Sequence, residues 1–159
     1  MTATLNDPQA IESVLTTPGT WAVVGLSGNS TRTAYRIAHW LDDRLGHTII
    51  PIHPSAETVF GQHGYRSVAE IPDGTRVDVV DCFVRSDLVG AVVDEAIEHR
   101  DRLGIRLVWM QLGVIDADAA ERAAAAGLEV VMDTCPKIEY PKLASRQSAD
   151  RNKASTAQN

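Results

Sequence analysis

The segment Gly25-Leu-Ser-Gly-Asn-Ser-Thr-Arg32 holds residue types that proteins use to bind phosphate. It follows a short apolar run and precedes a helix-like pattern. A strand, a glycine turn and a helix N-terminus in this order present backbone N–H groups and the positive end of the helix dipole to an anion. A hydroxyl stands where a dinucleotide fingerprint has its second glycine. The segment therefore indicates a nucleotide-type ligand, or else only the glycine turn that any strand–helix connection needs. The candidate contacts are Gly25, Ser27, Gly28, Asn29 and Arg32.

The end of the second apolar run narrows the choice of nucleotide. NAD-binding domains place Asp or Glu there to hold the ribose 2′-OH. Here that position is His53, followed by Pro54, and the next carboxylate is Glu57. The sequence therefore disfavours NAD and favours a ribose that carries an additional phosphate, with Arg32 nearby. Taken alone, His53 is equally consistent with an ordinary loop histidine at the sheet edge.

Cys135 is the strongest candidate for covalent chemistry. It stands beside Pro136 and Lys137, and a neighbouring cation raises the thiolate fraction of a cysteine. Such a thiol could form a mixed disulfide with a ligand thiol. No histidine and aspartate accompany it as a catalytic set, so we expect a packing cysteine and a protein that is not an enzyme. Cys82 lies inside an apolar run and is predicted to be core, which leaves two free thiols.

The remaining polar candidates point to no catalytic or metal site. Asp81 alternates with valines, so it is either a buried partner of a basic group or a polar contact at a strand end. The histidines are scattered over predicted helices and loops, where we expect them to be mostly solvated: His39, His47, His63 and His99.

Apolar runs that alternate with helical patterns must position these residues. The runs predict strands at Trp21–Leu26, Thr48–Ile52, Val77–Phe83, Arg106–Leu112 and Glu129–Asp133. Helical spacing of apolar residues predicts helices at Pro8–Leu15, Ala34–Leu45, Leu88–Leu103 and Asp116–Ala126, with a brief one near Ser67–Ile71.

This alternation predicts an α/β fold with a Rossmann-like, doubly wound parallel sheet of about five strands. The simplest strand order is 3-2-1-4-5, which puts the switch point between strands 1 and 4 and places Cys82 and Cys135 near opposite edges. Ligands of such sheets bind at the carboxyl ends of the strands. Besides the glycine loop, the residues at those ends are Ile52–Pro54, Phe83–Arg85, Gln111–Gly113 and Thr134–Lys137. The candidate contacts among them are His53, Pro54, Phe83, Val84, Arg85, Gln111 and Gly113.

Length and charge bound the other possibilities. The chain has 159 residues, a formal net charge of −6 and a pI of about 5.3. One domain over residues 1–143 is expected, with a polar tail over 144–159 that is predicted to be disordered. The negative charge disfavours nucleic acid and anionic membranes as partners. The N-terminal residues do not resemble a signal peptide, and no apolar run is long enough to span a bilayer, so a cytoplasmic protein is expected.

The sequence resembles the stand-alone CoA-binding domain family, small Rossmann-like proteins related to the CoA-binding domain of succinyl-CoA synthetase α subunits. The resemblance runs from about Ile11 to Leu143. Its most specific blocks are Trp109-Met-Gln-Leu-Gly and Cys135-Pro-Lys-Ile-Glu-Tyr. The other matching segments are Val23–Ser27, Arg32–Arg36, Ile50–Pro54, Ser67–Pro72 and Val77–Phe83.

The resemblance implies coenzyme A, or an acyl-CoA, bound across the strand ends. It places the diphosphate at Gly25, Ser27 and Gly28, with Arg32 near it. It places His53 and Pro54 by the adenosine, with Phe83 to Arg85 flanking the adenine. Gln111 and Gly113 would line the route of the pantetheine arm.

Three functions are consistent with the sequence, and the first is preferred. It is a non-catalytic CoA or acyl-CoA binding module, acting as a carrier or sensor. The second is an NAD(P)-dependent oxidoreductase, and the third is an interaction subunit with a vestigial nucleotide pocket. The partner expected is a small-molecule nucleotide ligand. The chain is expected to be a monomer or a homodimer, and the sequence names no partner protein.

Overall fold

Parallel strands and covering helices alternate along the chain, as their apolar patterns predict. The computed structural model describes residues 5–143. The strands are β1 (Thr20–Val24), β2 (Thr48–Ile52), β3 (Val79–Cys82), β4 (Leu107–Met110) and β5 (Glu129–Val131). The helices are α1 (Pro8–Thr16), α2 (Thr33–Leu45), α3 (Ser86–Leu103) and α4 (Ala117–Ala125), with a single 3-10 turn, η1 (Val68–Glu70). Residues 136–143 are also helical, which the sequence analysis did not predict.

The five strands form one parallel sheet in the order β2-β1-β3-β4-β5. The Rossmann-like α/β class is thus confirmed, whereas the predicted order 3-2-1-4-5 is wrong: β3 pairs with β1 and not with β2. Pro51 supplies the physical reason. Proline has no N–H to donate, so a strand that contains it belongs at a sheet edge. The outer side of β2 is occupied instead by Tyr65, whose backbone N–H donates to Pro51 O at 3.0 Å.

Two further expectations change with the strand order. The switch point of the sheet lies between β1 and β3, where the connections leave in opposite directions. Cys82 ends the central strand β3 and is fully buried, so it is not near a sheet edge. Cys135 follows β5, which is an edge strand, and both cysteines are free, as predicted.

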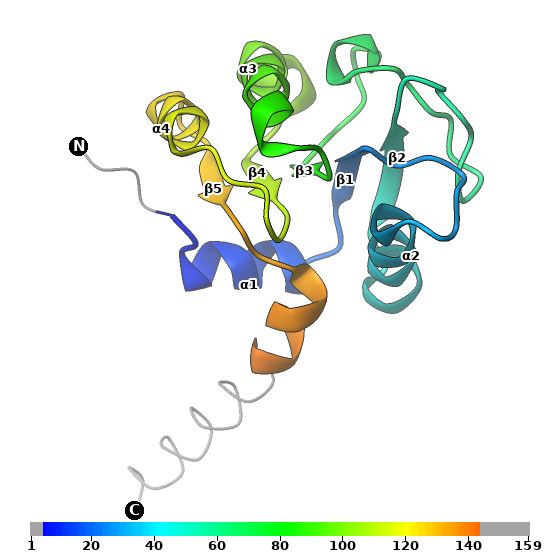
Figure 1. Ribbon diagram of the computed structural model, residues 1–159, viewed down its shortest axis with the longest axis horizontal. Coiled ribbons are helices and arrows are strands. Elements are labelled where there is room, and N and C mark those ends of the chain that lie inside the picture. Colours follow the sequence, from blue (N-terminus) through cyan, green and yellow to red (C-terminus); the bar gives the residue numbers. More distant parts are fainter. Residues whose placement is uncertain (1–4, 144–159) are drawn as a thin grey trace, which may run out of the picture.

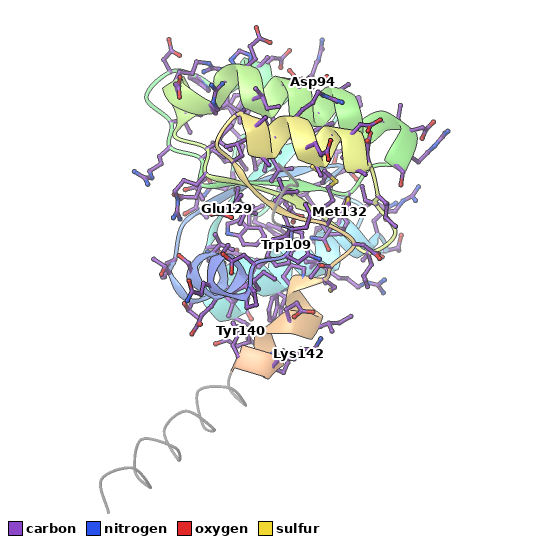
Figure 2. The ribbon with its side chains drawn as sticks, turned by 90° about the vertical axis from the view of Figure 1, so that its left-hand side faces the viewer. Asp94, Trp109, Glu129, Met132, Tyr140 and Lys142 are labelled. Atoms are coloured by element: carbon purple, nitrogen blue, oxygen red, sulfur yellow. The ribbon has the colours of Figure 1, made fainter. Side chains whose placement is uncertain are left out.

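The sheet is covered on both faces, which makes three layers (Figure 1). One core packs α3, α4 and η1 against side chains such as Ala22, Val80 and Val108. The other packs α1 and α2 against Trp21, Val23 and Trp109. In Figure 2, Trp109 lies at the level of the sheet, between the two helical layers. Strand residues of both faces are therefore apolar, as in parallel sheets buried on both sides.

The amino-terminal edge of the sheet is held by a buried charge. Asp78 accepts a hydrogen bond from Thr20 N at 2.9 Å, and Arg76 and Arg106 both approach its Oδ1. His47 is buried there, contrary to the expectation of a solvated side chain, and its Nδ1 accepts from Gly19 N. Burial lowers the pKa of His47. These contacts are structural and leave the other edge for a ligand.

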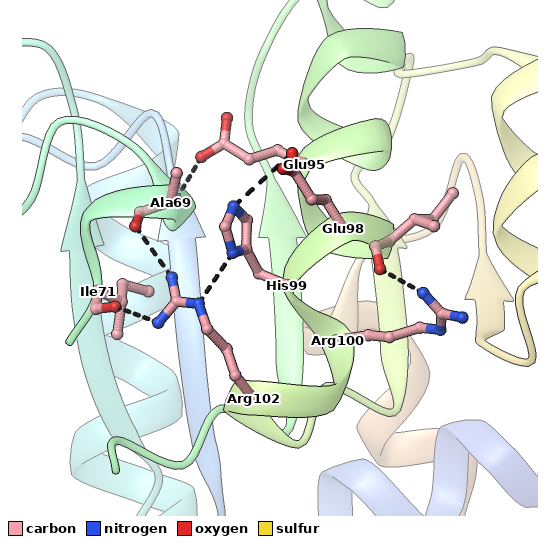
Figure 3. Close-up of polar contacts among 8 residues, drawn as sticks. Ala69, Ile71, Glu95, Glu98, His99, Arg100 and Arg102 are labelled. Atoms are coloured by element: carbon pink, nitrogen blue, oxygen red, sulfur yellow. Dashed lines mark hydrogen bonds and ion pairs between the residues drawn. The ribbon is translucent and has the colours of Figure 1, made fainter. Parts of the chain in front are cut away.

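Helix α3 fixes the long connection from β2 to β3 (Figure 3). The Arg102 guanidinium donates to Ile71 O at 2.6 Å and to Ala69 O at 2.9 Å. Glu95 accepts from Ala69 N, so η1 is held by side chains of opposite charge. Arg102 Nε also donates to His99 Nδ1. The connection that carries His53 is therefore anchored to the helical layer.

The boundaries of the longer elements agree with the sequence pattern. Asp7 and Asp116 cap α1 and α4 through their carboxylates, and Gly46 and Gly104 end α2 and α3 in left-handed conformations. Within residues 5–143, no helix is long and apolar enough to cross a membrane. The predicted disorder of the tail lies outside the described residues.

Candidate functional site

A pocket of about 860 Å³ opens at the carboxyl ends of the strands, within the range typical of small-molecule sites. It is lined by residues from the loops that follow β1, β2, β3, β4 and β5. The predicted site residues on it are Gly25, Ser27, Asn29, Arg32, His53, Pro54, Phe83, Val84, Arg85 and Gln111. The others are Thr33, Ala34, Leu112, Val114 and Cys135. Their ligand contacts stay predictions, but the fold brings most of the expected set to one place.

Gly25 shapes the base of the pocket. It has φ +99°, and a Cβ placed on it would lie 2.3 Å from Phe83 O. Its N–H donates to Ile52 O at 2.8 Å, and Phe83 N donates to Val24 O. The loops after β1, β2 and β3 are thereby brought into contact at the switch point. Only glycine allows this close approach.

A carboxylate of the same chain already occupies one donor of the glycine loop. Gly28 N donates to Glu57 Oε2 at 2.8 Å, and Gly28 does not line the pocket. Glu57 comes from the connection after β2, 29 residues further along the chain. A phosphate at this loop would have to share or replace that contact.

The rest of the loop is ordered by short-range hydrogen bonds that lead into α2. Asn29 Oδ1 accepts from Thr31 N at 3.1 Å and from the Thr31 hydroxyl at 2.6 Å. Arg32 is the N-cap residue of α2 and offers no side-chain cap. Its guanidinium is exposed and has no ion-pair partner within residues 5–143. An unpaired cation therefore stands at a helix N-terminus on the rim of the pocket.

The other basic groups of the pocket are already engaged. Arg85 forms two hydrogen bonds to the Asp87 carboxylate, at 3.0 and 2.7 Å. His53 Nδ1 accepts from Ser55 N at 3.1 Å and lies 2.8 Å from the Ser55 hydroxyl. Because Nδ1 accepts, the proton of the neutral ring lies on Nε2. His53 can thus donate one hydrogen bond.

The far half of the pocket carries no charge on its lining residues. It is formed by Gln111, Leu112, Val114 and Cys135. Beneath it, Gln111 Nε2 donates to Asp81 Oδ1 at 2.6 Å. Asp81 is fully buried, and that burial raises its pKa to about 7. Burial, together with the Asp81 charge, also raises the pKa of the Cys82 thiol.

The pocket thus combines a cationic phosphate-binding geometry with an uncharged arm. A nucleotide diphosphate can lie at the N-terminus of α2, where Arg32 can neutralise it. The N–H groups of Gly25, Gly28 and Thr31 already donate within the protein, so the phosphate would use the helix end and the cation more than these donors. A neutral extension can lie along the second half. Within the described residues, no group of three or more metal-binding side chains is present.

Comparison with known proteins identifies the family. The family described as CoA binding domain matches residues 19–141. The chain belongs to this family. The matched residues include all the pocket loops, from the end of β1 to the segment after β5.

Three relatives each match 70% or more of the chain. The chain is 32% identical over 119 residues to the uncharacterized protein YneT of Bacillus subtilis (strain 168), which covers 75% of this chain and 83% of that protein. A hypothetical protein from Pyrococcus horikoshii OT3 has a solved structure that superposes with a TM-score of 0.76 and 32% identity, covering 87% of this chain and 92% of that one. A 4-hydroxybutyrate–CoA ligase (ADP-forming) of Nitrosopumilus maritimus (strain SCM1) is 24% identical over 111 residues, which are 70% of this chain but 16% of the ligase.

Two residues of the predicted set lie beside the CoA-binding domain's pocket. The N–H of Gly28 is bound by Glu57, and the N–H of Gly113 donates to Asp133 Oδ1 at 2.8 Å. Asp133 adopts a positive φ of 55°, which turns the chain after β5 toward the loop after β4. No local sequence pattern predicts the Gly28–Glu57 and Gly113–Asp133 contacts, because the partners are 29 and 20 residues apart.

Five residues that line the pocket lie outside the set predicted from the sequence. Thr33 and Ala34 begin α2, and Leu112 and Val114 flank Gly113. Leu112 is itself a strand-end residue, Thr33 and Val114 are each next to a predicted residue, and Ala34 lies two positions beyond Arg32, so extending the predicted set by two positions would have included all four. Cys135 lines the pocket as well, although its treatment as a packing residue kept it off the predicted site.

Proposed function

We propose that this protein binds coenzyme A or an acyl-CoA across the carboxyl ends of its strands, as a carrier or sensor without catalytic activity. The observation that supports this most directly is the division of the pocket. Its first half offers a glycine loop, a helix N-terminus and the unpaired cation of Arg32. Its second half is neutral, as the pantetheine arm of CoA is. Membership in the CoA binding domain family supports the same ligand.

The absence of a catalytic role is part of the proposal. Cys135 lines the pocket, but within the described residues no hydrogen bond joins its thiol to a histidine or a carboxylate. A nucleophilic cysteine needs such a base, or a depressed pKa, to react. The similarity to a CoA ligase covers only 16% of that enzyme, so the ligase activity is not carried over here.

A comparison of ligands tests the proposal. Thermal unfolding would be followed with CoA, acetyl-CoA, NAD, NADP and ATP side by side. A ligand that binds only the native state at 100 times its dissociation constant stabilises it by about 2.7 kcal/mol. Stabilisation by the CoA species supports the proposal. Stabilisation by NAD or NADP alone would assign the protein to the oxidoreductases, and no effect from any of them would favour an interaction subunit with a vestigial pocket.

Arg32→Ala is expected to weaken CoA binding about ten- to a hundredfold, because a charge-assisted contact to phosphate contributes about 1.5–3 kcal/mol. Titration calorimetry at two salt concentrations would measure the loss and its decrease at high salt. Arg44→Ala is the matched control, since Arg44 lies in the last turn of the same helix. Equal effects of the two variants would show that only net charge matters and would contradict a contact at the glycine loop.

Glu57→Gln is expected to tighten CoA binding about fivefold. The change removes the negative charge of the carboxylate beside Gly28 N and leaves an oxygen that can accept the hydrogen bond from Gly28 N. A carboxylate and a phosphate 4 Å apart in water repel by about 1 kcal/mol per pair of unit charges. Competition titrations in low salt would measure the gain. Glu121→Gln, an exposed position on α4, should change nothing. Weaker binding in Glu57→Gln would mean that the carboxylate holds the loop in its binding conformation.

A further inference from the structure

Asp81 is a buried carboxylate that the proposed function does not use. It lies in the central strand β3, has no exposed surface, and has an Oδ2 atom without a hydrogen-bond partner. Its Oδ1 accepts from Gln111 Nε2 at 2.6 Å. Burying a carboxylate is costly unless it is fully paired. A half-satisfied acid in the middle of the sheet therefore invites a functional explanation.

The contact fixes which end of the Gln111 carboxamide faces the pocket. Gln111 Nε2 donates to Asp81 Oδ1, and above pH 7, where Asp81 is ionised and can only accept, this contact keeps the amide nitrogen toward Asp81. The amide oxygen has no hydrogen-bond partner within residues 5–143. Among the described residues, the fully buried side-chain polar atoms without a hydrogen-bond partner are His47 Nε2 and Asp81 Oδ2, and the Gln111 oxygen is not one of them. The oxygen is therefore not one of the fully enclosed atoms, and Gln111, which is 4% exposed, lines the pocket.

We propose that Asp81 is a positioning residue that holds the Gln111 oxygen toward the pocket, so that the site accepts an N–H or S–H donor of the ligand's neutral arm. The inference rests on the proposed function and adds the polarity of one contact. Leu112, Val114 and Cys135, which line the same half, place no charged group there. A hydrogen-bond acceptor on this otherwise largely apolar wall matches the amide N–H groups and the thiol of a pantetheine arm.

The test compares ligands that differ in the arm. CoA carries the whole arm, desulfo-CoA lacks only the thiol, and adenosine 3′,5′-bisphosphate lacks the arm but keeps phosphate groups. At pH 8, Asp81→Asn is expected to weaken CoA binding about five- to tenfold and to leave binding of the bisphosphate unchanged, because the new amide can donate as well as accept and no longer holds the Gln111 oxygen toward the ligand. If wild-type protein binds desulfo-CoA as well as CoA, the donor is an amide N–H; weaker binding of desulfo-CoA assigns the thiol.

A double variant separates positioning from general damage. In Asp81→Asn/Gln111→Glu, the new amide donates to one carboxylate oxygen and leaves the other facing the pocket, so binding of CoA should recover to within about twofold of wild type. NMR of the glutamine side chains gives a second readout that needs no ligand. The Gln111 NH₂ protons should exchange slowly with solvent in wild type and faster in Asp81→Asn.

The outcomes separate failure of the proposed function from failure of the positioning role. Failure of wild-type protein to bind CoA overturns the proposed function, and this inference with it. If wild type binds CoA, equal weakening of CoA and the bisphosphate in Asp81→Asn shows a structural effect and overturns the positioning role. Unchanged CoA binding, or a double variant that does not recover, overturns it as well.

Discussion

Asp81→Asn is expected to raise the free energy of unfolding by about 2–4 kcal/mol at pH 8 and to have little effect at pH 4.5. Burial raises the pKa of Asp81 from its ordinary value of 3.8 to about 7. A pKa that is higher in the folded state stabilises the fold while the group is protonated, and that contribution is lost as pH rises from about 4 through 7. A pKa shift of that size corresponds to about 4 kcal/mol of folding free energy, and structural relaxation around the charge reduces this figure. The asparagine side chain keeps the shape of the neutral acid without the charge.

Denaturant unfolding of both proteins at pH 4.5, 6 and 8 would measure the difference. His47 also makes stability depend on pH, but in the opposite sense. Its pKa is lowered by burial, so its contribution is lost as pH falls below about 6.5. This contribution is common to both proteins and cancels in the comparison. A difference that does not change with pH would contradict the raised pKa of Asp81.

Asp78→Asn is the matched control, because Asp78 lies in the same segment but is paired. Partial burial acts to raise its pKa, but the hydrogen bond from Thr20 and the two arginines outweigh this, and the pKa is lowered. Its contribution to stability is therefore present at neutral pH and is lost only as pH falls below about 4. At pH 8 the Asp78 variant should be less stable than wild type. Two neighbouring aspartates thus give changes of opposite sign.

The sequence was sufficient for the fold class because apolar periodicity is a local property. The strand at Thr48–Ile52 was predicted with its observed bounds, and helix boundaries followed from caps such as Asp116 and Gly46. Strand order is not local. It depended on Pro51, whose missing N–H confines β2 to the edge. That signal was in the sequence, but the simplest order was inferred without it.

The candidate site shows the same division. The rule that ligands bind at strand ends brought His53, Phe83 and Gln111 to one pocket without any knowledge of side-chain contacts. It could not show that Glu57 occupies Gly28 N or that Asp81 pairs with Gln111. These contacts join residues about 30 positions apart through loops and strand registers, and the sequence analysis left the partner of Asp81 open.

Gly25→Ala is expected to lower the free energy of unfolding by at least about 3 kcal/mol. The new Cβ would lie 2.3 Å from the Phe83 carbonyl oxygen, a backbone atom that cannot move aside as a side chain can. The residue also keeps φ +99°, which costs an alanine about 1–2 kcal/mol by itself. Relief of the clash requires β1 and β3 to separate at the switch point. The hydrogen bond from Phe83 N to Val24 O would weaken as a result.

Gly46→Ala separates the two causes of that effect. Gly46 has φ +73°, but a Cβ there meets nothing within 4 Å. This variant should therefore lose only the conformational cost, about 1 kcal/mol. Denaturant unfolding would measure both variants, and a CoA titration would follow for any Gly25→Ala protein that folds. Similar losses in the two variants would show that the strands at the switch point can yield. A much larger loss at Gly25 would show that the close approach of the β1 and β3 loops, which forms the base of the pocket, tolerates no side chain.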